Sequence, residues 1–264
     1  MLADDHGIQI VLMLDKRRKQ ILIMKVSLDQ HFMTDIKTLQ KIADSAELSK
    51  SDTVLEIGAG TGVLTRVLAN SGAKVIAIEI DPELSAVLKE RFHSQKNVEI
   101  FEGNALKLIK KLKFNKIVSN IPYAICEPLM LLLRTVDFDV AVLTIPKSFL
   151  GKLASGSRLG FESSVFFEIK ELFKVPKKAF SPEPGTESVV VGIRPARNIP
   201  RTVLLRPKAK LKNAIMEALV EARKCTKNQA REAIKALNLS NIIMEKRVAD
   251  MDLNDLRQLL SKLK

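Results

Sequence analysis

The stretch that decides the fold is Val54-Leu-Glu-Ile-Gly-Ala-Gly-Thr-Gly62. A short apolar run, 53–57, leads into it and an amphipathic stretch, 64–71, follows it, so the pattern predicts a strand, a tight turn and a helix. Glycines 58, 60 and 62 allow a sharp turn and let a ligand approach the backbone closely. The spacing is E-x-G-x-G-x-G, because valine at position 63 breaks the dinucleotide pattern G-x-G-x-x-G.

A carboxylate follows at the distance expected for a nucleoside ligand. Glu79 ends the next apolar run, 21 residues after Gly58, where a carboxylate can accept hydrogen bonds from both hydroxyls of a ribose. S-adenosylmethionine (SAM) is a nucleoside ligand without a pyrophosphate, and it suits this arrangement. A purely structural turn is the alternative interpretation.

Strand-like and helix-like segments alternate through the middle of the chain. The apolar runs are 53–57, 74–80, 98–101, 117–119 and 140–145, and the amphipathic stretches between them are 64–71, 83–92, 105–112 and 127–135. This alternation predicts an α/β fold with a parallel sheet covered by helices on both faces. Runs 165–173 and 188–194 flank a Pro-rich loop, 175–185, that is too short for a crossover helix, so they predict an antiparallel pair at one edge. The expected fold class is therefore α/β with a mostly parallel seven-stranded sheet and helices on both faces.

A second motif, Asn120-Ile-Pro-Tyr123, follows the fourth predicted strand. The side-chain oxygen of Asn120 and a backbone carbonyl near Pro122 can accept hydrogen bonds from the two N6 hydrogens of adenine and stabilise the positive charge that develops there. Tyr123, the single tyrosine of the chain, can stack on a base that is flipped out of its helix. The motif therefore indicates methylation of an exocyclic base amine, and a turn with a half-buried tyrosine is the structural alternative.

Two further residues are candidate site residues, and for each a purely structural role is an equally good interpretation. Asn104 follows the third predicted strand, where it can bond an adenine amine or serve as an ordinary turn asparagine. Phe180, in Phe180-Ser-Pro-Glu-Pro184, can close the other face of the flipped base or anchor the core.

Charge and composition narrow the class of partner. The formal net charge is +13, and residues 196–264 carry sixteen Lys and Arg against seven Asp and Glu. A basic tail predicts a polyanionic partner, usually nucleic acid, although a solvated basic surface is the simpler alternative. Two cysteines favour a reducing compartment, and the start of the chain lacks the pattern of a signal peptide, so we expect a cytoplasmic protein with no membrane partner. Three scattered histidines predict no metal site.

The last quarter of the chain has a helical pattern. The segment 193–207 is rich in proline and arginine and is interpreted as a linker. Beyond it, Thr226 is a candidate helix cap, and leucines repeat at helical spacing through 253–263. The expected units are an N-terminal extension, 1–26, a methyltransferase domain, 27–195, and a small basic all-α domain, 196–264.

These motifs together resemble the ribosomal RNA small-subunit adenine dimethyltransferase family (the KsgA type) over about residues 27–264. The matching pieces, in the family's order, are Asp29-Gln-His-Phe32, Val54-Leu-Glu-Ile-Gly-Ala-Gly-Thr-Gly-Val-Leu-Thr65, Ile78-Glu-Ile-Asp-Pro-Glu-Leu84, Asn120-Ile-Pro-Tyr123, Phe180-x-Pro-x-Pro184 and Glu187-Ser-Val-Val-Val191.

The resemblance implies a SAM-dependent methyltransferase Rossmann-like fold with a small all-α C-terminal domain. It also implies an enzyme that dimethylates N6 of two adjacent adenosines in the 3′-terminal hairpin of small-subunit rRNA during ribosome biogenesis. It implies a small ribosomal subunit or its precursor as partner, with the basic tail docking on rRNA, and a monomer is the default expectation. The implied cofactor-binding residues are Gln30, His31, Glu56, Gly58, Gly60, Glu79, Ile80, Asn104, Ala105 and Asn120. The implied catalytic residues, which hold or stack on the target base, are Asn120, Pro122, Tyr123 and Phe180.

Three departures from the family pattern keep alternatives open. The stretch Leu143-Thr-Ile-Pro-Lys-Ser-Phe-Leu150 lacks the family's Gln-Lys-Glu segment, and Asn104 stands where Asp is usual. Residues 1–25, with Lys16-Arg-Arg-Lys19, are an RNA-contacting arm, an unstructured extension or the product of a misassigned start. The alternative functions are a large-subunit rRNA methyltransferase of the macrolide-resistance type and a non-catalytic assembly or nucleic-acid-binding factor on the same fold.

Overall fold

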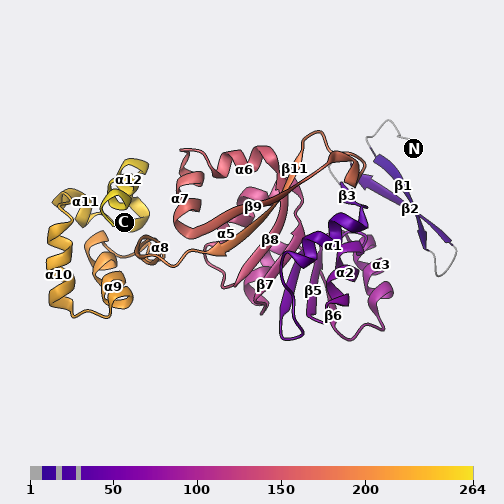
Figure 1. The fold of residues 1–264 in the computed structure, drawn as a ribbon, viewed down its shortest axis with the longest axis horizontal. Helices are drawn as coiled ribbons and strands as arrows, with labels where there is room; N and C mark the ends of the chain where they lie inside the picture. Colours follow the sequence, from indigo (N-terminus) through magenta and orange to yellow (C-terminus); the bar gives the residue numbers. More distant parts are fainter. Residues whose placement is uncertain (1–7, 16–19, 28–30, 264) are drawn as a thin grey trace.

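A seven-stranded sheet forms the centre of the molecule in the computed structural model, which describes residues 8–15, 20–27 and 31–263, with side chains from residue 31 onward (Figure 1). The strand order is β6-β5-β4-β7-β8-β11-β9. The five parallel strands are β4 (Thr53–Ile57), β5 (Lys74–Glu79), β6 (Val98–Glu102), β7 (Lys116–Asn120) and β8 (Val140–Pro146). Strand β11 (Ser188–Pro195) lies antiparallel between β8 and β9 (Phe167–Val175). The predicted sheet and its antiparallel edge are confirmed.

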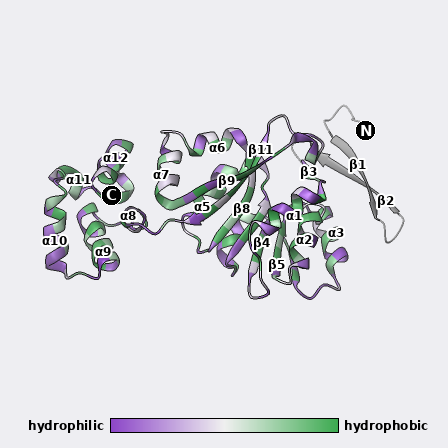
Figure 2. Ribbon diagram, viewed as in Figure 1, coloured by the Kyte–Doolittle hydropathy of each residue, from purple (hydrophilic) through white to green (hydrophobic). Residues whose placement is uncertain are grey.

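Helices cover both faces of this sheet because alternate strand residues point to opposite sides. Val54 packs into one core cluster with α1 (Ile36–Asp44), α2 (Val63–Asn70) and α3 (Pro82–Phe92). Leu55 packs into the other with α4 (Ala105–Leu108), α5 (Cys126–Leu133), α6 (Lys147–Leu153) and α7 (Arg158–Phe166). Figure 2 shows the hydrophobic character of the strands between these layers. Such near-continuous apolar strands are typical of a sheet that is buried on both faces.

Two helices and a short strand pair differ from the sequence-based expectation. Residues 158–166 form α7, so the predicted strand 165–173 begins two residues late, and α6 precedes it. Ser157 caps α7, its side chain accepting a hydrogen bond from the Gly160 N–H at 3.2 Å. In the Pro-rich loop, β10 (Phe180–Ser181) pairs antiparallel with β3 (Phe32–Met33), after a 3₁₀ turn at Lys177–Ala179. This pairing brings the Pro-rich loop beside the segment that carries His31.

The C-terminal helices gather at one end of the molecule (Figure 1) and enclose a hydrophobic cluster of their own. They are α8 (Ile199–Leu204), α9 (Leu211–Arg223), α10 (Lys227–Ala236), α11 (Asn241–Glu245) and α12 (Leu253–Lys262). The interpretation of 193–207 as a linker is wrong in part, because β11 continues to Pro195 and Asn198 caps α8 within that segment. Thr226 caps α10 in a capping box with Gln229, as the sequence predicts.

The described residues before His31 form an antiparallel pair, β1 (Ile8–Asp15) and β2 (Gln20–Ser27), at the end of the molecule opposite the C-terminal helices (Figure 1). Because residues 8–15 and 20–27 form paired strands, the alternative of an unstructured N-terminal extension is wrong for them. The basic run at 16–19 lies outside the described residues. No helix in the described part of the chain is long and apolar enough to cross a bilayer.

A candidate cofactor and target-base site

The Gly-rich turn after β4 is shaped by three glycines with positive φ, of which Gly62, at +75°, precedes α2. Gly58 and Gly60 have φ of +72° and +55°. The Gly60 N–H donates a hydrogen bond to Glu79 Oε2 at 2.7 Å. A Cβ on Gly58 would lie 3.1 Å from the ring of Pro122, and one on Gly60 would lie 2.9 Å from the ring of Phe32. The turn therefore requires glycine both for its backbone conformation and for its close packing against the segments around it.

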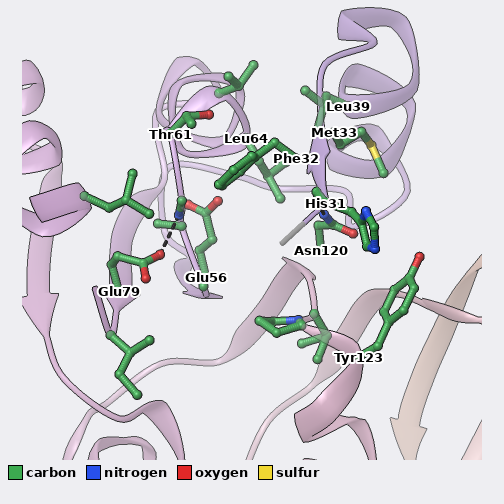
Figure 3. Close-up of a pocket in the computed structure, with 18 residues that line it drawn as sticks. His31, Phe32, Met33, Leu39, Glu56, Thr61, Leu64, Glu79, Asn120 and Tyr123 are labelled. Atoms are coloured by element: carbon green, nitrogen blue, oxygen red, sulfur yellow. Dashed lines mark hydrogen bonds between the residues drawn. The ribbon is translucent and has the colours of Figure 1, made fainter. Parts of the chain in front are cut away.

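A pocket of about 200 Å³ lies at the carboxyl ends of the parallel strands. The predicted site residues that line it are His31, Glu56, Gly58, Gly60, Glu79, Ile80, Asn120, Pro122 and Tyr123. In Figure 3, Glu56 and Glu79 lie on one side of the pocket, and His31, Asn120 and Tyr123 lie on the other. Ile80 adds an apolar wall, and its side chain is 63% exposed, unusually high for a large hydrophobic residue. Open α/β sheets bind ligands at this edge, where the ends of the strands meet.

Glu56 is a buried carboxyl with an unused acceptor. Its side chain is 2% exposed, and Oε2 has no hydrogen-bond partner among the described residues. Burial raises the pKa of Glu56 to about 8, and the nearby charge of Glu79 adds to this effect, while Thr65 partly opposes it. An unpaired buried acceptor is costly unless a ligand completes it. SAM carries an ammonium and a sulfonium, and a cation of this kind would favour the ionised form of Glu56, so a cationic ligand suits this wall of the pocket.

Asn120 and Tyr123 stand on the opposite side with complementary chemistry. The Asn120 side-chain nitrogen donates to the His31 carbonyl at 3.4 Å, and the side-chain oxygen, Oδ1, has no partner within the described part of the chain. The pKa of Tyr123 is raised by burial. Its hydroxyl lies 2.5 Å from Ser188 Oγ, and its ring lies 6.1 Å from the ring of His31. A free amide acceptor next to a half-buried aromatic ring is an arrangement that can bind a base by its amine and its face.

Three predicted site residues, Asn104, Ala105 and Phe180, do not line this pocket. Gln30 lies outside the described residues. The Asn104 side chain accepts a hydrogen bond from the Leu106 N–H at 2.9 Å and caps α4, and Ala105 is buried beside it. Phe180 is 3% exposed in the core cluster beneath β3, so its ring does not face the pocket. Contacts of Asn104, Ala105 and Phe180 with cofactor or base would require these three residues to rearrange. These contacts, like that of Gln30, stay predictions.

Several pocket residues do not follow from the motif reasoning. Phe32, Met33 and Leu39 form an apolar part of the lining. Phe32 belongs to the Asp29–Phe32 motif, but only the tertiary structure places its ring against Gly60. The contact between Ser188 and Tyr123 joins residues 65 apart in the chain. In the sequence, the only sign of this contact is a single serine at the start of the apolar run 188–191, and that is a weak signal.

Comparison with known proteins agrees with this geometry. A family model described as ribosomal RNA adenine dimethylase matches residues 22–253. A probable ribosomal RNA small subunit methyltransferase A of Methanosarcina acetivorans is 42% identical over 63% of this chain and 64% of that protein, slightly less than two thirds of its length. The protein with the same description from Methanococcus aeolicus is 34% identical over 83% of this chain and 86% of its own length. A crystal structure of a dimethyladenosine transferase from Plasmodium falciparum superposes with a TM-score of 0.61 at 28% identity and covers 88% of this chain and 97% of that one.

The family model spans most of the chain, and the fold, the Gly-rich turn and the strand-end pocket are those of a SAM-dependent methyltransferase. The resemblance inferred from the motifs is thus confirmed, and the chain belongs to the ribosomal RNA adenine dimethylase family.

Proposed function

We propose that the chain is a SAM-dependent rRNA adenine-N6 dimethyltransferase, whose target is the pair of adjacent adenosines in the 3′-terminal hairpin of small-subunit rRNA. The observation that carries the proposal is the unpaired Oδ1 of Asn120, which shares a pocket with the unpaired Oε2 of Glu56. Asn120 Oδ1 suits the amine of a base, and Glu56 Oε2 suits a cationic cofactor. The names of the relatives, which describe small-subunit rRNA methyltransferases, support the choice of substrate.

The residues of this chain divide the work between cofactor and base. When bound, SAM supplies an electrophilic methyl group. Glu79 is placed to hold the ribose hydroxyls, and Gly58 and Gly60 let the ligand approach the turn. Glu56 balances positive charge at the inner wall of the pocket.

On the other side, Asn120 Oδ1 accepts a hydrogen from the adenine N6 amine. That bond orients the nitrogen lone pair and stabilises the charge that develops on it. Tyr123 stacks on the extruded base, and the Pro122 carbonyl, which already accepts a hydrogen bond from the Ile125 N–H at 3.0 Å, keeps the turn rigid. Phe180 remains a candidate for the second face of the base, provided its loop moves.

We also propose how the parts of the chain are used. Residues 27–195 carry the reaction, and the basic helices of 196–264 dock on rRNA of the small ribosomal subunit or its precursor. The sixteen basic side chains of that segment support this assignment. The protein is expected to act as a monomer in the cytoplasm.

The test is methyl transfer from labelled SAM to unmethylated small subunits, with large subunits in parallel, followed by mass spectrometry of the digested rRNA. Two dimethyladenosines in the 3′ hairpin of the small subunit are expected. Label confined to large-subunit rRNA would assign the chain to the macrolide-resistance type. Binding of both SAM and rRNA without any label would favour a non-catalytic assembly factor.

A further inference from the structure

The hydroxyl end of Tyr123 is tied to a rigid part of the sheet. Its oxygen lies 2.5 Å from Ser188 Oγ. Ser188 is 1% exposed and is the first residue of β11, where the strand register places it between Pro146 of β8 and Val175 of β9. A side chain flanked by strands on both sides has little freedom to move, so the serine is a fixed anchor for the phenol.

Tyr123 itself lies in a turn and not within the sheet. Tyr123 begins the 3₁₀ turn Tyr123–Ile125, and its neighbours Pro122 and Ala124 are exposed. The tyrosine ring itself is half-buried at the mouth of the pocket. Rotation about the two side-chain torsions of Tyr123 would swing the ring across that mouth unless its far end is held.

The Tyr123 ring also lies near His31, which contacts the loop that leads to Ser188. The ring of His31 lies 6.1 Å from that of Tyr123, tilted by 40°, and His31 Nδ1 lies 3.0 Å from the Pro182 carbonyl oxygen. Pro182 and Ser188 belong to one stretch of chain that follows β10. This stretch therefore positions Tyr123 both directly, through Ser188, and indirectly, through His31.

We infer that Ser188 is a positioning residue, which sets the angle of the Tyr123 ring for stacking on the target base through the hydrogen bond between the two hydroxyls. The inference rests on the proposed function, because it assigns a role within the same site. Ser188 does not line the pocket, so its loss should affect transfer and leave the binding of SAM unchanged. If the Ser188 hydroxyl only provided a hydrogen-bond partner for Tyr123, its loss would instead affect the folding stability alone.

The composition of the chain allows the mobility of the Tyr123 ring to be measured directly. Tyr123 is the only tyrosine and there is no tryptophan, so the intrinsic fluorescence of the protein reports on this one ring. We expect Ser188→Ala to lower the fluorescence anisotropy of Tyr123, because the ring gains rotational freedom. Ser163→Ala is the matched control, since Ser163 is also buried, at 3% exposure, but lies in α7 away from the pocket.

The kinetic arm uses Ser188→Ala, Tyr123→Phe and the double variant with small subunits as substrate. Each single variant removes the same hydrogen bond and should lower kcat about tenfold, or about 1.4 kcal/mol in activation free energy. The SAM dissociation constant should stay within about twofold of the parent value, since the cofactor contacts are intact. The double variant should be no slower than Tyr123→Phe alone, because one interaction cannot be lost twice.

Unchanged anisotropy in Ser188→Ala, an unchanged kcat, or losses that multiply in the double variant would each overturn the inference. If Ser188→Ala does not fold, Tyr123→Phe decides, because it keeps the ring and removes only the hydroxyl. If the parent protein transfers no methyl group, the proposed function fails. The anisotropy comparison would still show whether Ser188 holds the ring.

Discussion

At the scale of single residues, Glu56 links ligand recognition to folding stability. Its folded-state pKa of about 8 lies above the ordinary value of 4.5 for a glutamate carboxyl. Between these two pH values the carboxyl is protonated in the folded chain and ionised in the unfolded chain. The unfolded state then binds fewer protons, so the free energy of unfolding falls as pH rises from about 4.5 to about 8.

Replacing Glu56 with glutamine should therefore stabilise the ligand-free protein at pH 8 relative to the parent. The expected gain is on the order of 2–4 kcal/mol and should disappear near pH 4.5. The same variant should bind SAM more weakly, because glutamine cannot supply the negative charge that balances the cation. Thermal unfolding at several pH values checks the first effect, and calorimetric titration checks the second. Glu162→Gln is the control, since Glu162 pairs with Arg134 and Arg158 and its replacement should destabilise the fold at every pH in this range.

Asn120→Ala tests the amine acceptor. Methyl transfer should fall by about a hundredfold or more, the usual effect of removing one group that stabilises transition-state charge, while SAM still binds. Asn97→Ala is the matched control, because that amide bonds the carbonyls of Ala69 and Ala73 at the opposite ends of the strands. Transfer that survives in Asn120→Ala, measured by incorporation of labelled methyl into small subunits, would remove Asn120 from the catalytic role.

At the scale of elements, the connection between β4 and α2 depends on glycine conformation. Gly60→Ala places a Cβ 2.9 Å from the Phe32 ring at a positive φ. We expect it to destabilise the protein by about 1–3 kcal/mol and to weaken SAM binding. In Gly151→Ala the new methyl group meets nothing within 4 Å inside α6, so it should stabilise the protein by about 0.5–1 kcal/mol. Opposite signs in chemical denaturation are expected, and a loss of stability in both variants would contradict this reading of Gly60.

Comparing the elements shows which of them could be predicted from sequence patterns. The buried parallel strands are short apolar runs bounded by turn residues, and their boundaries agree with the prediction within about two residues. Helices α6 and α7 are missed because each is short, with seven and nine residues, and because the apolar end of α7, Val165-Phe166, runs directly into β9. Their starts are marked only by Pro146 and Ser157, which are weak signals. The pairing of β3 with β10 joins residues about 150 apart, and no local pattern records such a contact.

At the scale of the whole molecule, most of the net positive charge lies in residues 196–264. The helices of this segment gather at one end of the molecule, beyond the sheet (Figure 1). Arg223 and Lys224 are exposed at the end of α9, where Lys224 adopts a left-handed conformation that ends the helix. Exposed charge at a helix end is available to phosphate groups, and each such contact releases counterions.

Replacing Arg223 and Lys224 together with glutamate should weaken rRNA binding and reduce the slope of its logarithmic dependence on salt by about two. The control reverses Lys50 and Lys96, which are also exposed but precede β4 and β6 at the edge of the sheet opposite the pocket. Both double variants change the net charge equally. If their salt slopes shift by the same amount in filter-binding assays, the tail acts through net charge alone and does not dock.

The sequence by itself determined the class of the molecule. The patterns of apolar residues, the three glycines, the acid at the end of β5 and the Asn120–Tyr123 motif are all short-range features. Such features can be read from the sequence alone. Only the tertiary structure decided that Glu56 and Asn120 each keep an unpaired oxygen in one pocket, that Phe180 is buried, and that Ser188 meets Tyr123. These facts depend on how distant segments pack, and packing is set by the whole set of contacts rather than by any stretch of residues.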